Sequence, residues 1–386
     1  MSTGEESGDL YGALLTRELK RRARGVTIEG FGGARMKEAG ARVDSTLLGA
    51  AVIGWTGVLR HARTYLRLLA GLRRRWRRDP PDAVVLIDNP GFNLRVARIA
   101  AARAIPVASF ICPQVWGWGA QRLILMRRVL RRAYPVLPFE EDLLRAFGIR
   151  AAFLGHPILD VLPARPPSRG AACARAGLDP RRPLHLLLPG SRTEEVARHL
   201  PLMLEAARRF RDAGRAQWVV VVTRDSAAAV ESFASSSPVA VTLTRDPGYA
   251  LRANADLVWT KSGTATLELG LLGVPQVVVY RMHWINWLIV TSRVQVGYAG
   301  LVNLILGRRA VPELLQGAFT PDALVRASRA LRVRGRARVR RDAAELRRRL
   351  GAPGATRRVA ADLLTLVARR RCSRSCTCCA PPPPPR

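Results

Sequence analysis

The sequence predicts an α/β fold made of two Rossmann-like domains that face each other across a cleft. Short apolar runs alternate with helical patterns along the chain, and this alternation indicates parallel strands joined by crossover helices. A proline-rich stretch at residues 163–169 separates the runs into two series and is typical of an interdomain linker. The length of 386 residues independently favours two domains over one.

The apolar runs give the order of the expected strands. The first series predicts strands at residues 83–87, 106–111, 134–137 and 151–154, and the second at 184–188, 218–222, 239–243, 255–259 and 276–280. Helices are expected between most of them. The predicted divisions are an N-terminal domain 1–163, a C-terminal domain 164–345, a helix 346–371 that packs back on the first domain, and a disordered Cys- and Pro-rich tail 372–386.

The chain opens on a small polar turn, Gly4–Leu10, which runs into an expected helix ending at Arg22. Such a turn normally follows a strand, but only three residues precede it, so the first strand is expected to be missing or the true start to lie upstream. A missing strand would leave its neighbours with an unpaired edge. The turn either presents backbone donors to a ligand and holds Glu5 in the cleft, or caps the helix through Ser7 or Asp9.

The net charge of +34 attracts polyanions and anionic membranes. Arginine supplies most of it, because Lys20, Lys37 and Lys261 are the only lysines, and such a bias is also typical of a GC-rich genome. Acidic substrates or a membrane surface are the favoured partners. Nucleic acid is not expected, since the arginine runs lack interleaved aromatic side chains that stack on bases.

Residues 47–78 begin apolar and end in an arginine run around Trp76. Two interpretations remain open: a membrane-interface segment, or a core-facing helix whose charged last turn suits the helix dipole. The chain shows no signal peptide at its start and no apolar run of about 18 residues, the length that spans a bilayer. A cytoplasmic protein that touches a membrane is therefore expected.

Two small-residue turns follow expected strands of the second domain, at residues 189–192 (PGSR) and 262–268 (SGTATLE). Such turns bring backbone N–H groups and a helix N-terminus to a ligand phosphate. Arg192 adds a bidentate phosphate contact, and Glu268 lies within reach of a ribose hydroxyl. The two turns together predict a pocket for a nucleotide diphosphate.

Three side chains of the first domain are further candidates. Asp88 ends an expected strand and is either a general base or an Asx-turn residue. His156 also ends a strand and is either a structural hydrogen-bonding group or, because histidine titrates near neutrality, an acid–base group. Trp116, in a loop with a second indole, belongs either to the core or to a flat surface for a sugar or acyl chain.

The order and content of these motifs resemble one bacterial family. The motifs are GEESGD (4–9), DNPGFN (88–93), PQVWGW (113–118), LPFE (137–140), LGHP (154–157), LPGSR (188–192), SGTATLE (262–268), VVVYRM (277–282) and LVNLILGRRAVPELLQ (301–316). The set resembles the lipid A disaccharide synthases, inverting glycosyltransferases of the GT-B fold, over residues 4–345. SGTATLE and PGSR recur in other GT-B enzymes, whereas their combination with PQVWGW, GHP and PELLQ is specific.

The resemblance implies a reaction and a set of residues. UDP-2,3-diacylglucosamine would donate its sugar to the 6-hydroxyl of 2,3-diacylglucosamine 1-phosphate, giving a β-1′,6-linked disaccharide 1-phosphate and UDP. By resemblance, Asp88 is the general base or an essential carboxylate, and Glu5 organises the acceptor side. The residues implied for the donor are Arg192, Ser262, Gly263, Thr264 and Glu268 around UDP, and Asn303, Glu313 and Gln316 along the donor pocket. The family also binds the inner membrane peripherally.

No cofactor is expected, and no DxD-like cluster marks a metal site, so backbone dipoles and arginine would offset the charge of the leaving UDP. Two other functions remain open. One is another GT-B enzyme, such as a lipid-linked N-acetylglucosaminyltransferase or a UDP-N-acetylglucosamine epimerase. The other is a non-catalytic polyanion-binding protein. The arginine-rich helices after residue 334 are expected to pack on the first domain or on a second copy, which would make a homodimer.

Overall fold

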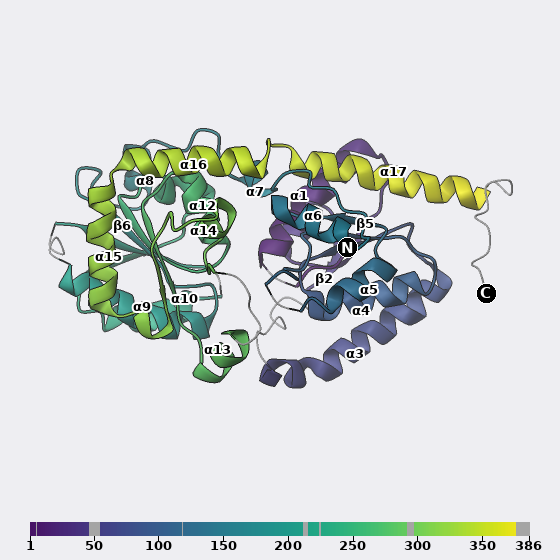
Figure 1. The fold of residues 1–386 in the computed structure, drawn as a ribbon, viewed down its shortest axis with the longest axis horizontal. Helices are drawn as coiled ribbons and strands as arrows, with labels where there is room; N and C mark the ends of the chain where they lie inside the picture. Colours follow the sequence, from purple (N-terminus) through teal and green to yellow (C-terminus); the bar gives the residue numbers. More distant parts are fainter. Residues whose placement is uncertain are drawn as a thin grey trace. The chain divides into compact units, whose positions relative to one another are not determined.

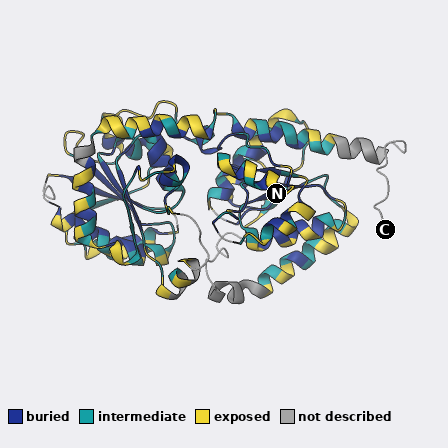
Figure 2. Ribbon diagram, viewed as in Figure 1, coloured by how far each residue is buried: buried dark blue, intermediate teal, exposed yellow. Residues whose placement is uncertain are grey.

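The structure is a computed structural model that describes residues 1–4, 6–45, 55–117, 119–210, 215–223, 225–291 and 297–375. The chain folds into two compact units (Figure 1). Unit 1 comprises Met1–Asp160 and the chain from Leu350 onward, and unit 2 comprises Val161–Arg349. In each unit, buried parallel strands lie among helices (Figure 2), as the alternation of apolar runs predicts.

The described part of unit 1 contains five short strands. They are β1 (Glu29–Phe31), β2 (Arg42–Asp44), β3 (Val84–Ile87), β4 (Val107–Phe110) and β5 (Arg132–Tyr134). β3, β4 and β5 form a parallel sheet in this order, and β1 pairs in parallel with β2. Every residue of β3 and β4 is buried, which explains why both strands stand out as continuous apolar runs.

The first residues of the chain connect these two groups of strands. Ser2 forms parallel bridges to Phe31 of β1 and to Leu86 of β3. Its N–H donates to the Val85 carbonyl at 2.9 Å, and its carbonyl accepts from the Ile87 N–H at 2.9 Å. The expected unpaired edge is therefore wrong at this level of the sheet, because one extended residue pairs on both sides.

The helices of unit 1 surround these strands. They are α1 (Glu6–Arg22), α2 (Ala34–Glu38), α3 (Trp55–Arg78), α4 (Pro90–Ala101), α5 (Arg122–Val129), α6 (Pro138–Ala146), α7 (Ile158–Val161) and α17 (Ala355–Ser375). α17 lies against α1 (Figure 1). It is separated from α16 (Arg336–Leu350) by a short break, so two helices stand where one was expected over 346–371. Residues 376–386 of the expected tail lie outside the described residues.

The described side chains of α3 favour one of the two interpretations of this segment. Leu69 is buried in the core of unit 1, and Tyr65, Leu72 and Trp76 pack against the same core. Trp76 therefore contacts the protein interior, as a core-facing helix requires; the start of the segment lies outside the described residues. Within the described part of the chain, no helix has both the length and the apolar composition needed to cross a bilayer.

Unit 2 contains a six-stranded parallel sheet in the order β11-β10-β9-β6-β7-β8. Its strands are β6 (Leu184–Leu188), β7 (Gln217–Val221), β8 (Val241–Thr244), β9 (Leu257–Lys261), β10 (Gln276–Tyr280) and β11 (Glu313–Leu315). Trp218 and Trp259 pack in its core with ring centroids 4.8 Å apart. Because β6, β9 and β10 are neighbours, the segments that follow them leave the sheet at the same edge, where open α/β sheets bind ligands.

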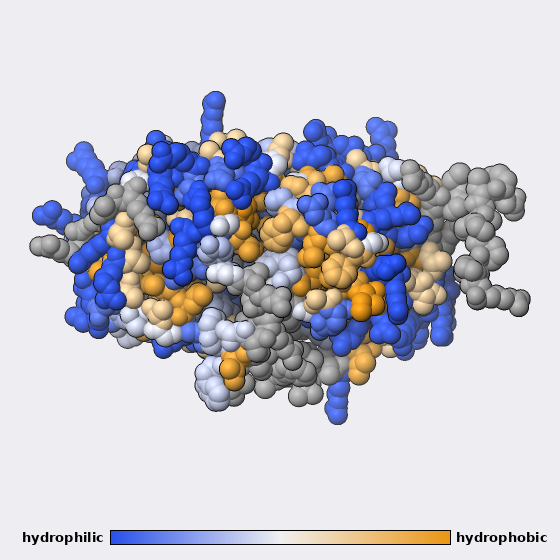
Figure 3. Space-filling model, in the orientation of Figure 1, coloured by the Kyte–Doolittle hydropathy of each residue, from blue (hydrophilic) through white to orange (hydrophobic). Residues whose placement is uncertain are grey.

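Helices flank this sheet. They are α8 (Arg169–Arg175), α9 (Thr193–Arg209), α10 (Ala227–Ser235), α11 (Ala250–Asn254), α12 (Thr264–Leu272), α13 (Trp284–Thr291), α14 (Leu301–Leu306), α15 (Pro321–Arg334) and most of α16. On the face drawn in Figure 3, hydrophilic side chains lie beside hydrophobic patches. Part of the positive charge is neutralised within the fold; Arg308, for example, lies 2.7 Å from Asp342 and 2.9 Å from Glu345.

The predictions of strand position are wrong where the apolar runs in the sequence are short. The strand expected at 134–137 ends at Tyr134, so its position is wrong by several residues. The strand expected at 151–154 is wrong, because only Ala151 pairs there, in a single bridge to Ala133. The sequence patterns also do not predict β1, β2 and β11, since each has three residues and lacks an apolar run of its own.

Candidate active site

The turn after β6 comes very close to helix α9. Gly190 has a φ of 135°, and a Cβ placed on it would lie 2.5 Å from Cβ of Glu195. A larger residue would collide there, so glycine allows the Glu195 carboxylate to fold back on the turn. In this position, Oε2 of Glu195 accepts a hydrogen bond from the Ser191 N–H at 3.1 Å.

Two cations share the Glu195 carboxylate. Lys261 Nζ lies 2.8 Å from its Oε1, and the Arg192 guanidinium lies 3.4 Å from the same oxygen. Lys261 ends β9 and Arg192 follows β6, so the pairing of these strands brings both predicted turns together. Burial alone would raise the pKa of the Glu195 carboxyl, but Lys261 and Arg192 outweigh burial, and the pKa is lowered. The carboxylate is therefore an ionised partner of both cations.

The turn after β9 opens helix α12. Gly263 is the N-cap and Thr264 the first helical residue, so the first backbone N–H groups lack partners within the helix. Ser262 Oγ donates to the Ala299 carbonyl at 2.7 Å, which fixes the turn. The structure thus places Ser262, Gly263 and Thr264 at the positive end of a helix, where an anion is stabilised.

Glu268 lies further along α12 and is largely buried. Arg252 donates to its Oε2 at 2.7 Å, and the Tyr249 hydroxyl donates to its Oε1 at 3.2 Å. Burial raises the pKa of the Glu268 carboxyl, and the charge of Arg252 opposes this effect. Both carboxylate oxygens already accept hydrogen bonds, and the contact of Glu268 with a ribose hydroxyl stays a prediction.

Asn303, Glu313 and Gln316 bind the backbone of the segments around β11. Asn303 is buried, and its Nδ2 donates to Glu313 Oε1 at 2.7 Å. The same carboxylate oxygen accepts from the Gly300 N–H at 3.0 Å. Gln316 Oε1 accepts from the Met282 N–H at 2.7 Å, and its Nε2 donates to the Met282 carbonyl at 3.2 Å. These contacts shape the edge of the sheet, and a direct role toward the donor stays a prediction.

His199 is a site residue that the sequence patterns do not single out. Its Nε2 accepts from the Arg281 N–H at 2.9 Å, so Nδ1 carries the proton and donates to the Pro189 carbonyl at 3.0 Å. Burial lowers the pKa of His199 to about 4, and the neutral ring ties the end of β10 to the turn after β6. His199 lies four residues after Glu195 and hence on the same face of α9, and the sequence patterns single out neither residue.

Asp88 directly follows β3 in a strained conformation. Its φ is 51°, and that of Asn89 is 44°, both in the left-handed region that non-glycine residues rarely adopt. The Asn93 amide holds this conformation, since Nδ2 donates to the Asp88 carbonyl at 2.6 Å and to the Ser2 carbonyl at 3.1 Å. Its Oδ1 accepts from the Ser2 hydroxyl at 2.6 Å. Asn93 belongs to the DNPGFN motif, but the motif alone assigns it no role.

Asp9 caps a helix other than its own. α1 begins at Glu6, so Asp9 lies within the helix and the expectation that it caps α1 is wrong. Its Oδ1 accepts from the N–H groups of Gly33 at 2.7 Å and Met36 at 3.1 Å, which begin α2. Ser7 also lies within α1, half-buried in its first turn, so the expectation that it caps α1 is wrong too.

His156 has a structural environment. Its ring is buried, and Nδ1 accepts from the Ile158 N–H at 3.0 Å. Burial lowers the pKa of His156 to about 3. A buried ring that accepts a backbone N–H favours the structural interpretation, and an acid–base role for His156 stays a prediction.

Trp116 is anchored through the polar edge of its indole. Its Nε1 donates to Glu140 Oε1 at 2.8 Å, and Glu140 Oε2 accepts from the Leu137 N–H at 3.0 Å. Burial raises the pKa of the Glu140 carboxyl to about 7, although these hydrogen bonds oppose the rise. The indole remains half-buried. The predicted residue Glu5 and the second indole, Trp118, lie outside the described residues.

Comparison with known proteins connects this geometry to a family. The family model described as Lipid-A-disaccharide synthetase matches residues 1–360. The chain belongs to the lipid-A-disaccharide synthase family. The lipid-A-disaccharide synthase of Syntrophus aciditrophicus (strain SB) is 38% identical over 376 residues, which cover 96% of this chain and 97% of the relative. That of Myxococcus xanthus (strain DK1622) is 37% identical over 371 residues, covering 94% and 96%.

Membership of the lipid-A-disaccharide synthase family makes the protein a glycosyltransferase of lipid A biosynthesis, which confirms the prediction from the motifs. The UDP-GlcNAc 2-epimerase from Neisseria meningitidis, solved bound to UDP-GlcNAc, aligns with a TM-score of 0.61 at 12% identity, covering 93% of this chain and 97% of that chain. The calicheamicin glycosyltransferase CalG4 aligns with a TM-score of 0.57 at 18% identity, covering 96% and 99%. At these identities the two structures show the GT-B fold alone, and the family match favours neither of the alternative functions.

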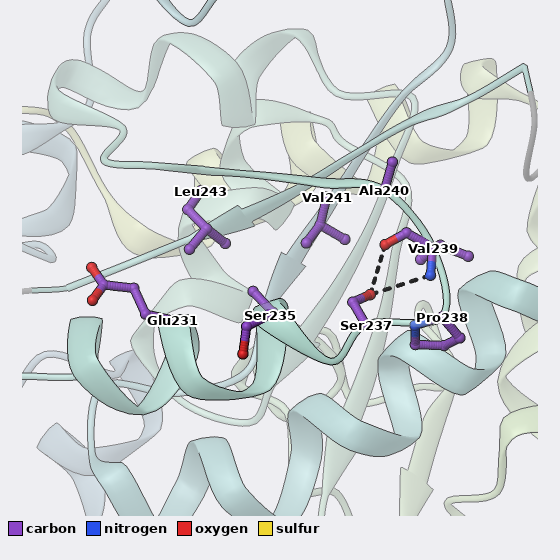
Figure 4. A pocket seen from close by; sticks show the side chains of 9 residues that line it. Glu231, Ser235, Ser237, Pro238, Val239, Ala240, Val241 and Leu243 are labelled. Atoms are coloured by element: carbon purple, nitrogen blue, oxygen red, sulfur yellow. Dashed lines mark hydrogen bonds between the residues drawn. The ribbon is translucent and has the colours of Figure 1, made fainter.

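A groove elsewhere in unit 2 holds none of the predicted site residues. Figure 4 shows it between α10 and the edge strand β8, lined by Glu231, Ser235 and residues 237–241. Ser237 Oγ donates to the Val239 carbonyl at 2.7 Å and so closes the turn beside it. Across the described ranges, no group of three or more His, Cys, Asp or Glu side chains is arranged to hold a metal ion.

Proposed function

We propose that this chain transfers the sugar of UDP-2,3-diacylglucosamine to the 6-hydroxyl of 2,3-diacylglucosamine 1-phosphate. The products are the β-1′,6-linked disaccharide 1-phosphate and UDP. The observation that carries the proposal is the pairing of β6 with β9, which brings the turn 189–192 beside the turn 262–264. Together these turns offer a helix N-terminus, backbone N–H groups and side-chain cations to a diphosphate.

Inversion at the anomeric carbon requires one direct displacement by the acceptor hydroxyl. We assign Asp88 as the base that takes the hydroxyl proton during attack. The hydrogen bond from Asn93 to the Asp88 carbonyl fixes the backbone that carries this carboxylate. As the bond to UDP breaks, negative charge grows on the diphosphate. Arg192 and the N-terminus of α12 would stabilise this charge, because oriented donors act most strongly where charge develops.

The same proposal places the protein at the cytoplasmic face of the inner membrane as a peripheral protein. Both proposed substrates carry acyl chains, and the net charge of +34 favours an anionic lipid surface. Leu66 on α3 has 67% of its surface exposed, which offers one apolar contact beside the arginines of that helix. Co-sedimentation with anionic vesicles but not with neutral vesicles is the expected result.

The reaction is tested with the purified full chain and both acylated sugars. We expect mass spectrometry to detect the disaccharide 1-phosphate, with an equal amount of UDP, only when donor and acceptor are supplied together. UDP-N-acetylglucosamine without acceptor is the control substrate. Absence of disaccharide from folded protein would contradict the proposal, and conversion of the control substrate to its 2-epimer would favour the epimerase alternative.

A further inference from the structure

Lys261 stands between the two turns that we assign to the donor. It is the last residue of β9 and the only lysine in the sequence of unit 2. Its ammonium lies 2.8 Å from Glu195 Oε1 and 5.7 Å from the centroid of the Tyr280 ring. A Cβ placed on Gly263 would lie 3.7 Å from the same ammonium, so the charge sits beside the N-cap of α12.

The Glu195 carboxylate shows that this place accepts an anion. It receives the Ser191 N–H at 3.1 Å, and it pairs with Lys261 at 2.8 Å and Arg192 at 3.4 Å. A backbone N–H, an ammonium and a guanidinium are also the groups that bind phosphate oxygens. Lys261 and Arg192 both face this carboxylate, so an anionic ligand at the turn would meet two cations as well as the backbone N–H.

We propose that Lys261 binds the diphosphate of the UDP-sugar donor directly, and that Glu195 and Tyr280 hold its ammonium in position. The inference rests on the proposed function, because it takes the donor to be a nucleoside diphosphate sugar. An ammonium has three hydrogens to donate, so Lys261 can keep Glu195 and still bind a phosphate oxygen. Its charge would also offset the charge that grows on the leaving UDP.

Titration calorimetry with UDP and with uridine tests the proposal. In Lys261→Met we expect the affinity for UDP to fall by about 10- to 100-fold, the range for a hydrogen bond to a charged group. The affinity for uridine should not change, because uridine has no phosphate. Lys37→Met removes the same charge from an exposed position in unit 1 and is the matched control. Lys261→Arg, which keeps the charge, should recover part of the lost affinity.

The same substitution in Glu195→Gln protein separates a loss of UDP binding from misfolding of the Lys261→Met variant. Lys261→Met leaves the Glu195 carboxylate with one cation fewer, whereas in Glu195→Gln protein the same change leaves no unpaired carboxylate. We expect Lys261→Met to weaken UDP binding in that background as well. Unchanged UDP affinity, or an equal loss for UDP and uridine, would overturn the inference. A Lys261-dependent affinity for UDP in a protein that makes no disaccharide would instead overturn the proposed function and leave this inference standing.

Discussion

The turn after β3 in unit 1 and the turns after β6 and β9 in unit 2 occupy equivalent places at the ends of parallel strands. The polar side chains at these turns differ in the groups that they bind. Around Asp88, the Ser2 hydroxyl donates to the Asn93 amide oxygen, and the Asn93 amide nitrogen donates to the backbone carbonyls of Ser2 and Asp88. In unit 2, the Glu195 and Lys261 side chains bind each other. The contacts in unit 1 fix the backbone conformation of Asp88. The ion pair in unit 2 instead holds charged side chains beside the turns that follow β6 and β9.

This difference separates two kinds of effect. Hydrogen bonds from buried side chains to backbone groups contribute to folding, because a buried group that loses its partner is costly. Charges gathered beside a helix N-terminus contribute to anion binding. Changes in the unit 1 network should therefore alter stability or turnover with UDP affinity preserved, and changes at the unit 2 turns should alter UDP affinity first.

The largest effect is expected for Asp88→Asn. The amide keeps the shape of the side chain but cannot take the acceptor proton, so kcat should fall by about 10²- to 10⁴-fold, the usual range for a general base. UDP affinity should stay that of the parent, because the proposed diphosphate site lies in unit 2. Steady-state kinetics and calorimetry measure both quantities. Asp79→Asn, at an exposed position, is the control, and a parallel loss of UDP affinity in Asp88→Asn would break the contrast.

The next effect is expected for Asn93→Ala. The change removes the donor to the Ser2 and Asp88 carbonyls and the acceptor for the Ser2 hydroxyl. The free energy of unfolding should fall by about 2 to 4 kcal/mol, since buried polar groups lose their partners, and kcat should fall with it. Urea denaturation and kinetics report the two losses. Ser2→Ala removes only the hydroxyl and should cost less; an equal cost would show that the carbonyl contacts contribute nothing.

The sequence predicts the glycine turns and most strands of both sheets because these features are local. A buried parallel strand is a continuous apolar run, and PGSR and SGTATLE show their small residues directly. The strands β1, β2 and β11 are missed because three residues carry too little pattern. Their pairing depends on partners distant in the chain, as Ser2 does when it bridges Phe31 and Leu86.

The chemistry of the site is harder to predict than its place. Asp9 is visible as a carboxylate near a helix start, yet it caps α2, whose first residues lie more than twenty positions away. His156 is visible as a histidine at a strand end, yet burial determines its pKa. The ion pair of Glu195 with Lys261 joins residues from different strand ends. In each case the missing information is which distant groups the fold brings together.

A pH-dependent effect is expected from Glu140 in unit 1. Burial raises the pKa of its carboxyl from 4.5 to about 7, so the unfolded chain releases this proton at a lower pH than the folded protein. Stability from Glu140 is therefore fully present below about pH 4.5 and is lost as pH rises through 7. The full loss should be about 3 kcal/mol at most, at about 1.4 kcal/mol per pKa unit. Buried His156 and His199 titrate with the opposite sign in this pH range, so the Glu140 contribution is read from the difference between the parent and Glu140→Gln. Urea denaturation at several pH values should show that the free energy of unfolding of the parent minus that of Glu140→Gln falls as pH rises through 7. Glu141→Gln is the control, and a difference that does not change with pH would contradict the assignment.

The smallest effect is expected for Asp9→Ala, which removes the cap that α1 provides to α2. The N–H groups of Gly33 and Met36 would lose their side-chain acceptor, and loss of a helix cap typically costs about 1 to 2 kcal/mol of stability. Asp9→Asn keeps one oxygen for the two N–H groups and should cost less than Asp9→Ala. Urea denaturation measures the loss, with Glu38→Ala at the exposed end of α2 as the control. UDP affinity should not change in either variant, because the Asp9 carboxylate accepts its hydrogen bonds from backbone N–H groups of unit 1. A fall in UDP affinity without a fall in stability would mean that the opening turn acts on the ligand. It would contradict the expectation that changes in unit 1 leave UDP affinity unchanged.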